Sequence, residues 1–252
     1  MTINQLETDY LVVGSGAVGM AFVDTLLSET DAGIVLVDRN HKPGGHWNQA
    51  YSFVTLHQPS AYYGVSSHEL CKGRKDEVGL NKGLMELASG AEVSAYFDEV
   101  MLHTFLPSGR VNYYPMCDYL GDGEFVSRLT GERYRVDALR KIVDATHLNT
   151  SVPITHTPNF SVADEANFIP PNFLPQVREA PGGYVVIGGG KTGIDTCLWL
   201  LENGVPPDSI RWIVSRDAWL LNRKNTQPTE EFFFDAIGAQ ADQMQAIAAA
   251  ES

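Results

Sequence analysis

Two short glycine-rich segments in this chain of 252 residues are spaced as a phosphate-binding loop requires. The first consists of Gly14, Ser15, Gly16, Ala17, Val18 and Gly19. In this spacing the first glycine permits a tight turn, the second lets the backbone approach a pyrophosphate, and the third lets a helix pack closely on a strand. Phosphate is attracted there by the unpaired N–H groups and positive dipole of a helix N-terminus. The alternative is a glycine-rich turn with a purely structural role.

A carboxylate follows this segment at the distance expected of a dinucleotide site. Asp38 ends the apolar run at 34–38, nineteen residues after Gly19. An acid in this place accepts hydrogen bonds from ribose hydroxyls and excludes a 2′-phosphate from that ribose. The first segment therefore predicts binding of FAD, NAD or a related dinucleotide.

The second glycine-rich segment repeats the pattern late in the chain. It consists of Gly188, Gly189, Gly190, Lys191, Thr192 and Gly193. We expect its amides, with the hydroxyl of Thr192 beside them, to hold a second pyrophosphate. Lys191 either adds positive charge near that pyrophosphate or is a solvated loop lysine, and the sequence favours neither.

The strand after this second segment ends in different residues. Ser215 and Arg216 offer a hydroxyl and a guanidinium, which match a 2′-phosphate through charge-assisted hydrogen bonds. This favours NADP. The neighbouring Asp217 could instead bind a plain ribose, so NAD stays open.

The residues around both segments predict the elements that position them. Each segment follows a short apolar run and precedes a helical pattern, which makes two βαβ units and favours a parallel sheet covered on both faces. The expected elements are strands at 9–14, 34–38, 184–187 and 210–214 and helices at 20–28 and 194–203. Gly204 ends the last of these helices.

The chain between the two units is less regular. Residues 40–81 predict long loops, and 91–105 predicts a helix from apolar residues at helical spacing. Three strand-like runs at 111–115, 124–129 and 132–136 suggest a small antiparallel layer, with the last two joined as a hairpin across Thr130-Gly131. Residues 140–145 would return to the main sheet. The segment 152–183 contains six prolines and predicts a crossing between domains, and the alanine-rich C-terminal stretch favours helix.

Composition narrows the class of protein. There are 18 Lys and Arg against 31 Asp and Glu, so the net charge of -13 repels nucleic acid and anionic membranes. The sequence shows neither a signal peptide nor an apolar run long enough to span a bilayer, which predicts a soluble, cytoplasmic protein. Cys71, Cys117 and Cys197 are too dispersed for a redox pair or a cysteine metal site, so we expect no metal. Electron transfer would need a bound cofactor.

The residues after Asp38 resemble a known group of enzymes. The run from Asp38 and Arg39 to Gly44-Gly45-His46-Trp47 is similar to the segment after the second strand of flavin-containing and Baeyer–Villiger monooxygenases, where an acid precedes Gly-Gly-x-Trp. In those families this loop lies along FAD. Paired glycines let backbone approach a flat ring system, and Trp47 offers a stacking surface. A glycine turn with a packed tryptophan is the structural alternative.

A second stretch extends the resemblance. Ala145 and Thr146 resemble the Ala-Thr-Gly crossing of two-dinucleotide-domain flavoproteins, although His147 stands where the family has glycine. The resemblance spans roughly 9–216. The fingerprint Phe-x-Gly-x-x-x-His of these monooxygenases is absent ahead of Gly188, so cofactor binding is better supported than oxygenation.

The resemblance implies an α/β chain with two Rossmann-like parts. A Rossmann-like FAD-binding domain with a small antiparallel β layer would cover 1–160, a crossing segment 161–183, and an incomplete NAD(P)-binding unit 184–252. Such enzymes return to the FAD domain after the NADP domain, so we expect this chain to be truncated or partial.

The implied function is hydride transfer from NADPH to FAD and then to oxygen or an organic substrate. His57 and Gln58 are the candidate catalytic residues, since His57 could donate to the flavin N1–C2=O region; a surface or core histidine is the alternative. A non-catalytic redox or nucleotide sensor, an inactive fragment, and a chain with two nicotinamide nucleotides and no flavin remain alternatives. We expect a small-molecule substrate, and homo-oligomerisation stays open.

Overall fold

The computed structural model describes residues 3–148, 152–216 and 220–250, and the chain divides into two compact units. The first unit comprises Met1–Gln49, Ser60–Lys72 and Ala91–Val152. The second comprises Ala50–Pro59, Gly73–Gly90 and Pro153–Ser252. Neither unit is a continuous stretch of chain, whereas the domains expected at 1–160 and 184–252 are. Those predicted limits stay predictions.

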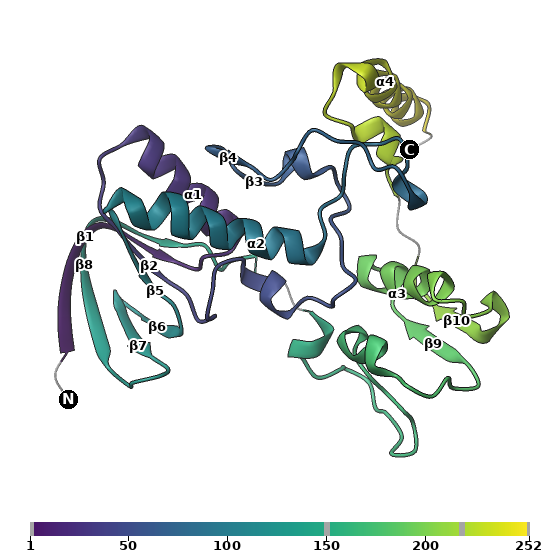
Figure 1. Ribbon diagram of the computed structural model, residues 1–252, viewed down its shortest axis with the longest axis horizontal. Coiled ribbons are helices and arrows are strands. Elements are labelled where there is room, and N and C mark those ends of the chain that lie inside the picture. Colours follow the sequence, from purple (N-terminus) through teal and green to yellow (C-terminus); the bar gives the residue numbers. More distant parts are fainter. Residues whose placement is uncertain (1–2, 149–151, 217–219, 251–252) are drawn as a thin grey trace. The chain divides into compact units, whose positions relative to one another are not determined.

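The first unit contains a six-stranded sheet of order β5-β2-β1-β8-β7-β6 (Figure 1). Its strands are β1 (Ile3–Val13), β2 (Ile34–Val37), β5 (Val111–Tyr114), β6 (Cys117–Gly121), β7 (Glu124–Ser127) and β8 (Arg133–Asp144). β5, β2, β1 and β8 are parallel, and β7 pairs antiparallel with both β8 and β6. The predicted α/β class and the parallel β1-β2 pair are confirmed. The segments expected at 132–136 and 140–145 form one strand, β8.

One strand of the predicted antiparallel layer is placed wrongly. The segment expected at 111–115 is β5, which pairs in parallel with β2 through Val37 and Tyr114. A long crossover containing a helix separates β2 from β5, and such a connection returns the chain in the parallel sense. The third antiparallel strand is β6, which the sequence analysis missed. The hairpin across Thr130-Gly131 is confirmed by the β7-β8 pairing.

Two helices belong to the first unit. α1 (Ala17–Glu29) and α2 (Gly90–Val100) confirm the helices expected at 20–28 and 91–105, and a π-helical turn continues α2 over Met101–Phe105. On β1, the ring of Tyr10 meets the ring of Phe22 on α1 edge-on at 6.0 Å. Because neighbouring side chains of a strand point to opposite faces, Leu11 points away from α1.

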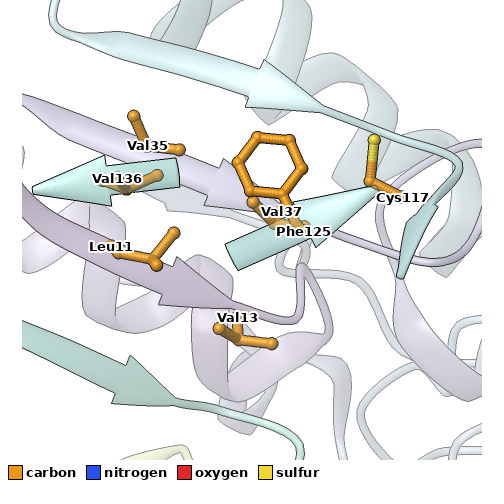
Figure 2. Packing of buried hydrophobic residues seen from close by; sticks show 7 residues of the cluster. All are labelled: Leu11, Val13, Val35, Val37, Cys117, Phe125 and Val136. Atoms are coloured by element: carbon orange, nitrogen blue, oxygen red, sulfur yellow. The ribbon is translucent and has the colours of Figure 1, made fainter. Parts of the chain in front are cut away.

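That opposite face carries the core shown in Figure 2. The buried cluster consists of Leu11, Val13, Val35, Val37, Cys117, Phe125 and Val136. Phe125, on β7, is fully buried and stacks on Tyr134 with ring centroids 4.8 Å apart. Burying each such side chain stabilises the fold by about 1.5–3 kcal/mol. The antiparallel strands therefore curl over the face of the parallel strands that α1 leaves uncovered.

A small hairpin completes the first unit. β3 (Gly64–Val65) and β4 (His68–Glu69) pair antiparallel within the region expected as loops. The Tyr96 hydroxyl accepts a hydrogen bond from the Val65 amide at 2.7 Å and donates to the His68 carbonyl at 2.6 Å. The rest of 40–81 is irregular apart from short 3-10 turns and isolated β-bridges at Thr55 and Lys75.

The second unit repeats a βαβ arrangement. β9 (Tyr184–Ile187) and β10 (Ile210–Ile213) are parallel and are joined through α3 (Lys191–Glu202), and Figure 1 shows α3 beside these strands. The core of this unit is formed by Leu174, Val186 and Leu200. The C-terminal stretch forms α4 (Phe233–Ala249), as its alanine content predicts. The 3-10 turns of the two units are Gly45–Gln49, Ser60–Tyr62, Gly79–Asn81, Leu106–Ser108, Pro153–Thr155, Pro171–Gln176, Pro207–Ser209, Arg223–Thr226 and Glu230–Phe232.

Within the residues that the structure describes, none of the helices combines the length and the apolar character needed to span a membrane.

Candidate nucleotide-binding sites

The first glycine segment forms a turn between β1 and α1. Gly14 has φ +100°, which residues with a side chain rarely adopt, and its amide donates to the Val37 carbonyl at 2.8 Å. Gly16 is the N-cap of α1, and no side chain caps the helix. The first turn also contains no acidic residue. The amides at the start of α1 therefore have no capping side chain and can bond an anion.

Close packing explains the last glycine of the segment. A Cβ on Gly19 would lie 1.9 Å from the Gly14 carbonyl oxygen, so α1 and the turn can approach only with glycine there. The predicted crossing residues lie against the same turn. The Ala145 amide donates to the Val13 carbonyl at 2.9 Å, and Thr146 Cγ2 lies 3.0 Å from the Cβ position of Gly14.

The predicted ribose ligand, Asp38, is 5% exposed and already bonded within the protein. Its Oδ2 accepts hydrogen bonds from the Ser15 amide at 2.6 Å and the Ser15 hydroxyl at 2.8 Å. Its Oδ1 accepts one from the Asn40 amide at 2.7 Å. A carboxylate has about four acceptor positions, so these three bonds leave room for one more. Asp38 thus fixes the glycine turn, and its contact with a ribose stays a prediction.

Tyr113 is a member of this site that the sequence analysis missed. Its hydroxyl lies 3.4 Å from the Ser15 hydroxyl, and burial raises the pKa of the phenol. Tyr113 reaches Ser15 because β5 pairs in parallel with β2 at Leu36. The sequence analysis assigned 111–115 to the antiparallel layer, and that assignment does not place Tyr113 beside Ser15.

The Gly-Gly-x-Trp loop packs directly on the glycine turn. The Gly44 amide donates to the Ser15 carbonyl at 2.9 Å, and a Cβ on Gly45 would lie 3.0 Å from Gly16 Cα. The Asn48 side-chain amide ties the loop together by donating to the carbonyl of Gly45 at 3.0 Å. The glycines of this loop and of the turn are far apart in the sequence, yet their backbones are in contact.

The aromatic residues of this loop are held in place. The Trp47 indole N–H donates to the Tyr63 hydroxyl at 2.7 Å, and the ring of His46 stacks on Trp47 with centroids 5.2 Å apart. Burial lowers the pKa of His46 and raises that of Tyr63. His46 is therefore a neutral ring at pH 7. The side chain of Arg39 is exposed, and its carbonyl accepts from Arg128 at 3.3 Å.

The second glycine segment has the backbone geometry of the first. Gly188 has φ +115°, its amide donates to the Ile213 carbonyl at 2.9 Å, and Gly190 is the N-cap of α3. A Cβ on Gly193 would lie 2.2 Å from the Gly188 carbonyl oxygen. Again no side chain caps the helix and its first turn holds no acid.

The residues beyond β10 differ from those beyond β2. Strand pairing makes Val214 the counterpart of Asp38, because Ile213 and Val37 accept the equivalent amide bonds. Val214 Cγ1 lies 2.6 Å from the Cβ position of Gly189, so an apolar contact replaces the Asp38–Ser15 bonds.

Ser215 and Arg216 follow Val214 and are both exposed. The Arg216 carbonyl oxygen lies 3.5 Å from the Cβ position of Gly189, which places this backbone beside the glycine turn. Asp217, the residue that keeps NAD open, lies outside the described residues.

Lys191 is the first residue of α3, and its ammonium pairs with Asp195 on the same helix. The Tyr51 hydroxyl donates to the same Asp195 oxygen at 2.8 Å. Burial, followed by these contacts with Asp195, raises the pKa of Tyr51. The sequence does not indicate the contact between Tyr51 and Asp195, since 144 positions separate them.

The candidate catalytic residues His57 and Gln58 belong to the second unit. His57 is exposed, and its pKa is lowered by partial burial and then by the charge of Lys191. Asp195 opposes this shift and Arg223 adds to it. A role of either residue toward a flavin stays a prediction.

The residues present fit dinucleotide cofactors at both places. Each glycine turn lies under an uncapped helix start, and the N-cap glycines, Gly16 and Gly190, face no protein atom closer than 3.6 Å at their Cβ positions. A buried acceptor of the Gly-Gly-x-Trp loop, Asn48 Oδ1, has no hydrogen-bond partner among the described residues. In the same part of the chain, no group of three or more His, Cys, Asp or Glu residues could hold a metal ion.

Comparison with known sequences identifies close relatives of this chain. It is 51% identical over 250 residues, 98% of its length, to uncharacterized proteins of Mycobacterium tuberculosis (strain ATCC 25618 / H37Rv) and Mycobacterium bovis (strain ATCC BAA-935 / AF2122/97). The chain covers 46% of these proteins, so it spans about half the length of the curated relatives it matches. No sequence-family model matches the chain.

Several solved structures have a similar fold. A flavin-containing monooxygenase from Stenotrophomonas maltophilia matches with a TM-score of 0.56 and 18% identity, over 86% of this chain and 60% of that one. Cyclohexanone monooxygenase from Rhodococcus sp. Phi1, bound to NADP+, matches with 0.53 and 23%, over 96% and 44%. A bacillithiol disulfide reductase from Staphylococcus aureus matches with 0.55 and 14%, over 96% and 65%. The chain has the Rossmann-like fold of flavin-dependent oxidoreductases and resembles the monooxygenases among them.

Proposed function

We propose that the chain binds FAD at the first glycine turn and NADPH at the second, and serves hydride transfer from NADPH to the flavin. FAD, when bound, supplies the hydride acceptor and passes electrons to oxygen or to a small organic substrate. Because the curated relatives are about twice as long as this chain, the activity of the whole protein is part of this proposal.

The observation that carries the proposal is the repeated uncapped helix start. α1 and α3 both begin at a glycine in extended conformation, with φ -74° and -79°, and neither has a capping side chain or an acid in its first turn. Because the chain has a net charge of -13, an anion is least repelled at these two helix starts. Two pyrophosphates, each on one helix, fit this arrangement.

The residues around the first turn have separable roles. Asp38 holds the Ser15 amide and hydroxyl and so keeps the turn in shape before a cofactor arrives. The Gly44 and Gly45 backbone keeps bulk away from Gly16. Trp47, fixed by Tyr63, and the neutral ring of His46 provide aromatic surface for a flat ligand.

NADP is favoured over NAD at the second turn by two residues. Val214 stands where the first site has a carboxylate, so no acid at that position repels a 2′-phosphate. The exposed guanidinium of Arg216 offers charge-assisted bonds to such a phosphate.

Alanine at the two N-cap glycines tests the proposal. A Cβ at Gly190 meets nothing within 4 Å, and one at Gly16 meets only Gly45 Cα at an ordinary 3.6 Å. Both variants should therefore fold normally, and each should lose affinity for the ligand of its own turn only. Gly16→Ala should lower flavin content, and Gly190→Ala should weaken NADPH binding in calorimetry. Unchanged binding in both variants would mean that these turns hold no pyrophosphate.

Hydride transfer is tested by mixing flavin-loaded protein with NADPH in the absence of oxygen. We expect the visible absorbance of the oxidised flavin to bleach almost completely. A protein that takes up FAD and keeps the oxidised spectrum with NADPH and NADH would overturn the proposed reaction while leaving flavin binding intact.

A further inference from the structure

Lys191 lies at a position of its helix where the helix dipole disfavours a positive charge. It is the first residue of α3, at the positive end of the helix dipole, where a cation is unfavourable. The corresponding residue of α1 is Ala17. The first turn of α3 contains no acidic side chain to offset the lysine. An ammonium in this place therefore needs a counter-charge from elsewhere.

Asp195 provides that counter-charge in the structure. Its Oδ2 bonds the Lys191 ammonium, and the side chains of Lys191 and Asp195 are 32% and 17% exposed. The same oxygen accepts the Tyr51 hydroxyl at 2.8 Å. Tyr51 is 5% exposed, so it holds the carboxylate from a buried position. Tyr51 itself is packed against Phe53, with ring centroids 4.7 Å apart.

The three side chains meet at the start of α3, which the second glycine segment forms. The Tyr51–Asp195 bond fastens segment 50–59 to α3, one turn after Lys191. A pyrophosphate on the α3 amides would offer the Lys191 ammonium a stronger, doubly charged acceptor than one carboxylate. Asp195 and that pyrophosphate would therefore compete for the same cation.

We propose that Asp195, held by Tyr51, is a positioning residue that keeps the Lys191 ammonium at the start of α3 and releases it to the pyrophosphate of the bound nicotinamide dinucleotide. This inference rests on the proposed nucleotide site at Gly188–Gly193. It makes Asp195 a residue that lowers the affinity of the site by competing for Lys191.

The competition acts on the pyrophosphate, which NAD and NADP share. Asp195→Asn keeps an acceptor for Tyr51 but removes the charge, so both nucleotides should bind about fivefold more tightly. Tyr51→Phe removes the hydroxyl that holds the Asp195 carboxylate and so releases Lys191 more easily, and both nucleotides should bind roughly twofold more tightly. An effect on the 2′-phosphate would instead change NADP binding alone.

The experiment measures NADP+ and NAD+ dissociation constants by calorimetry for the full chain, Asp195→Asn, Tyr51→Phe, Lys191→Gln and the doubles with Lys191→Gln. Flavin content, set by the first unit, serves as the control for folding. We expect tighter binding in Asp195→Asn and, to a smaller extent, in Tyr51→Phe, with equal shifts for the two nucleotides and no shift from either in the Lys191→Gln background. Tyr51→Phe removes a single oxygen atom and keeps the test available if Asp195→Asn does not fold.

Different failures have different meanings. If the unmodified chain binds neither nucleotide, the proposed second site is wrong and this inference falls with it. If it binds them and Asp195→Asn binds equally or more weakly, the proposed site stands and the role of Asp195 is overturned. A gain that persists in the Lys191→Gln background would also overturn it, since Asp195 would then act only by repelling phosphate.

Discussion

The two glycine turns have the same backbone and different side chains. Their first glycines have φ +100° and +115°, and their N-cap glycines have φ -74° and -79°. A Cβ on the last glycine would lie 1.9 Å from a carbonyl oxygen in the first turn and 2.2 Å from one in the second. Around this common frame the first turn has Ser15 bonded to Asp38, and the second has Gly189 packed on Val214.

The difference between the two turns separates two functions of the glycine motif, which are pyrophosphate binding and the choice of ribose. The shared backbone presents amides at a helix start, which suits any pyrophosphate. The residue after the second strand varies, and there a carboxylate or an apolar side chain decides which ribose is tolerated. The comparison therefore predicts that changes at the glycines affect binding of any dinucleotide, whereas changes beyond β2 or β10 affect stability or selectivity.

The largest expected effect comes from alanine at the last glycine of each turn. In Gly19→Ala and Gly193→Ala the new Cβ would overlap a carbonyl oxygen, so α1 or α3 must move, at a cost of about 3 kcal/mol. Gly19→Ala should be purified without flavin. Gly193→Ala should keep flavin and lose NADPH binding.

Flavin absorbance and calorimetry measure both losses. Gly238→Ala on α4, where a Cβ meets nothing within 4 Å, is the matched control and should leave both ligands bound. Retention of flavin by Gly19→Ala would show that the helix does not need the observed contact.

Asp38→Asn should have the next largest effect. An amide cannot accept from the Ser15 and Asn40 donors on both of its atoms, so a buried donor is left unpaired, at a cost of about 2 kcal/mol. We expect a lower urea midpoint for the first unit and a reduced flavin content. Val214→Ala, at the counterpart position, should spare flavin binding. Equal flavin loss in both variants would contradict the distinction drawn between the two turns.

Arg216→Gln should change selectivity without changing the fold. Loss of a charge-assisted contact to the 2′-phosphate should weaken NADP+ binding by about tenfold. NAD+ binding should not change, since NAD lacks that phosphate. Calorimetry with both nucleotides measures the ratio. A parallel loss for both would place Arg216 at the pyrophosphate instead.

The smallest expected effect is a pH dependence at the second turn. Partial burial, and then the charge of Lys191, lower the pKa of His57 below its ordinary 6.5, with Arg223 adding to the shift and Asp195 opposing it. His57 is thus neutral at pH 7 and gains a positive charge only as the pH falls below 6.5. NAD+ affinity should then rise by about twofold.

NAD+ is the ligand for this titration because it lacks a 2′-phosphate that would itself take up a proton. His57→Gln should flatten the dependence of NAD+ affinity on pH between pH 7 and pH values below 6. A profile that is already flat in the unmodified chain would show that His57 lies too far from the bound nucleotide to affect it.

Much of the fold was predictable because its signals are local. The strands β1, β2, β9 and β10 and the helices α1 and α3 follow from short apolar runs and helical spacing around the glycines. The β7-β8 hairpin followed from its turn residues. The placement of β5 did not, because a run such as 111–115 has the same pattern in a parallel and an antiparallel sheet.

Residue types and spacing by themselves determined that two turns with bare amides stand at two helix starts, since Gly14–Gly19 and Gly188–Gly193 need only their neighbours in sequence to form. Only the tertiary structure decided what surrounds them: that Asp38 holds Ser15, that Val214 is its counterpart, and that Tyr51 reaches Asp195. The physical reason is that each of these contacts joins residues distant in the chain. Their proximity depends on strand pairing and packing, which no local pattern encodes.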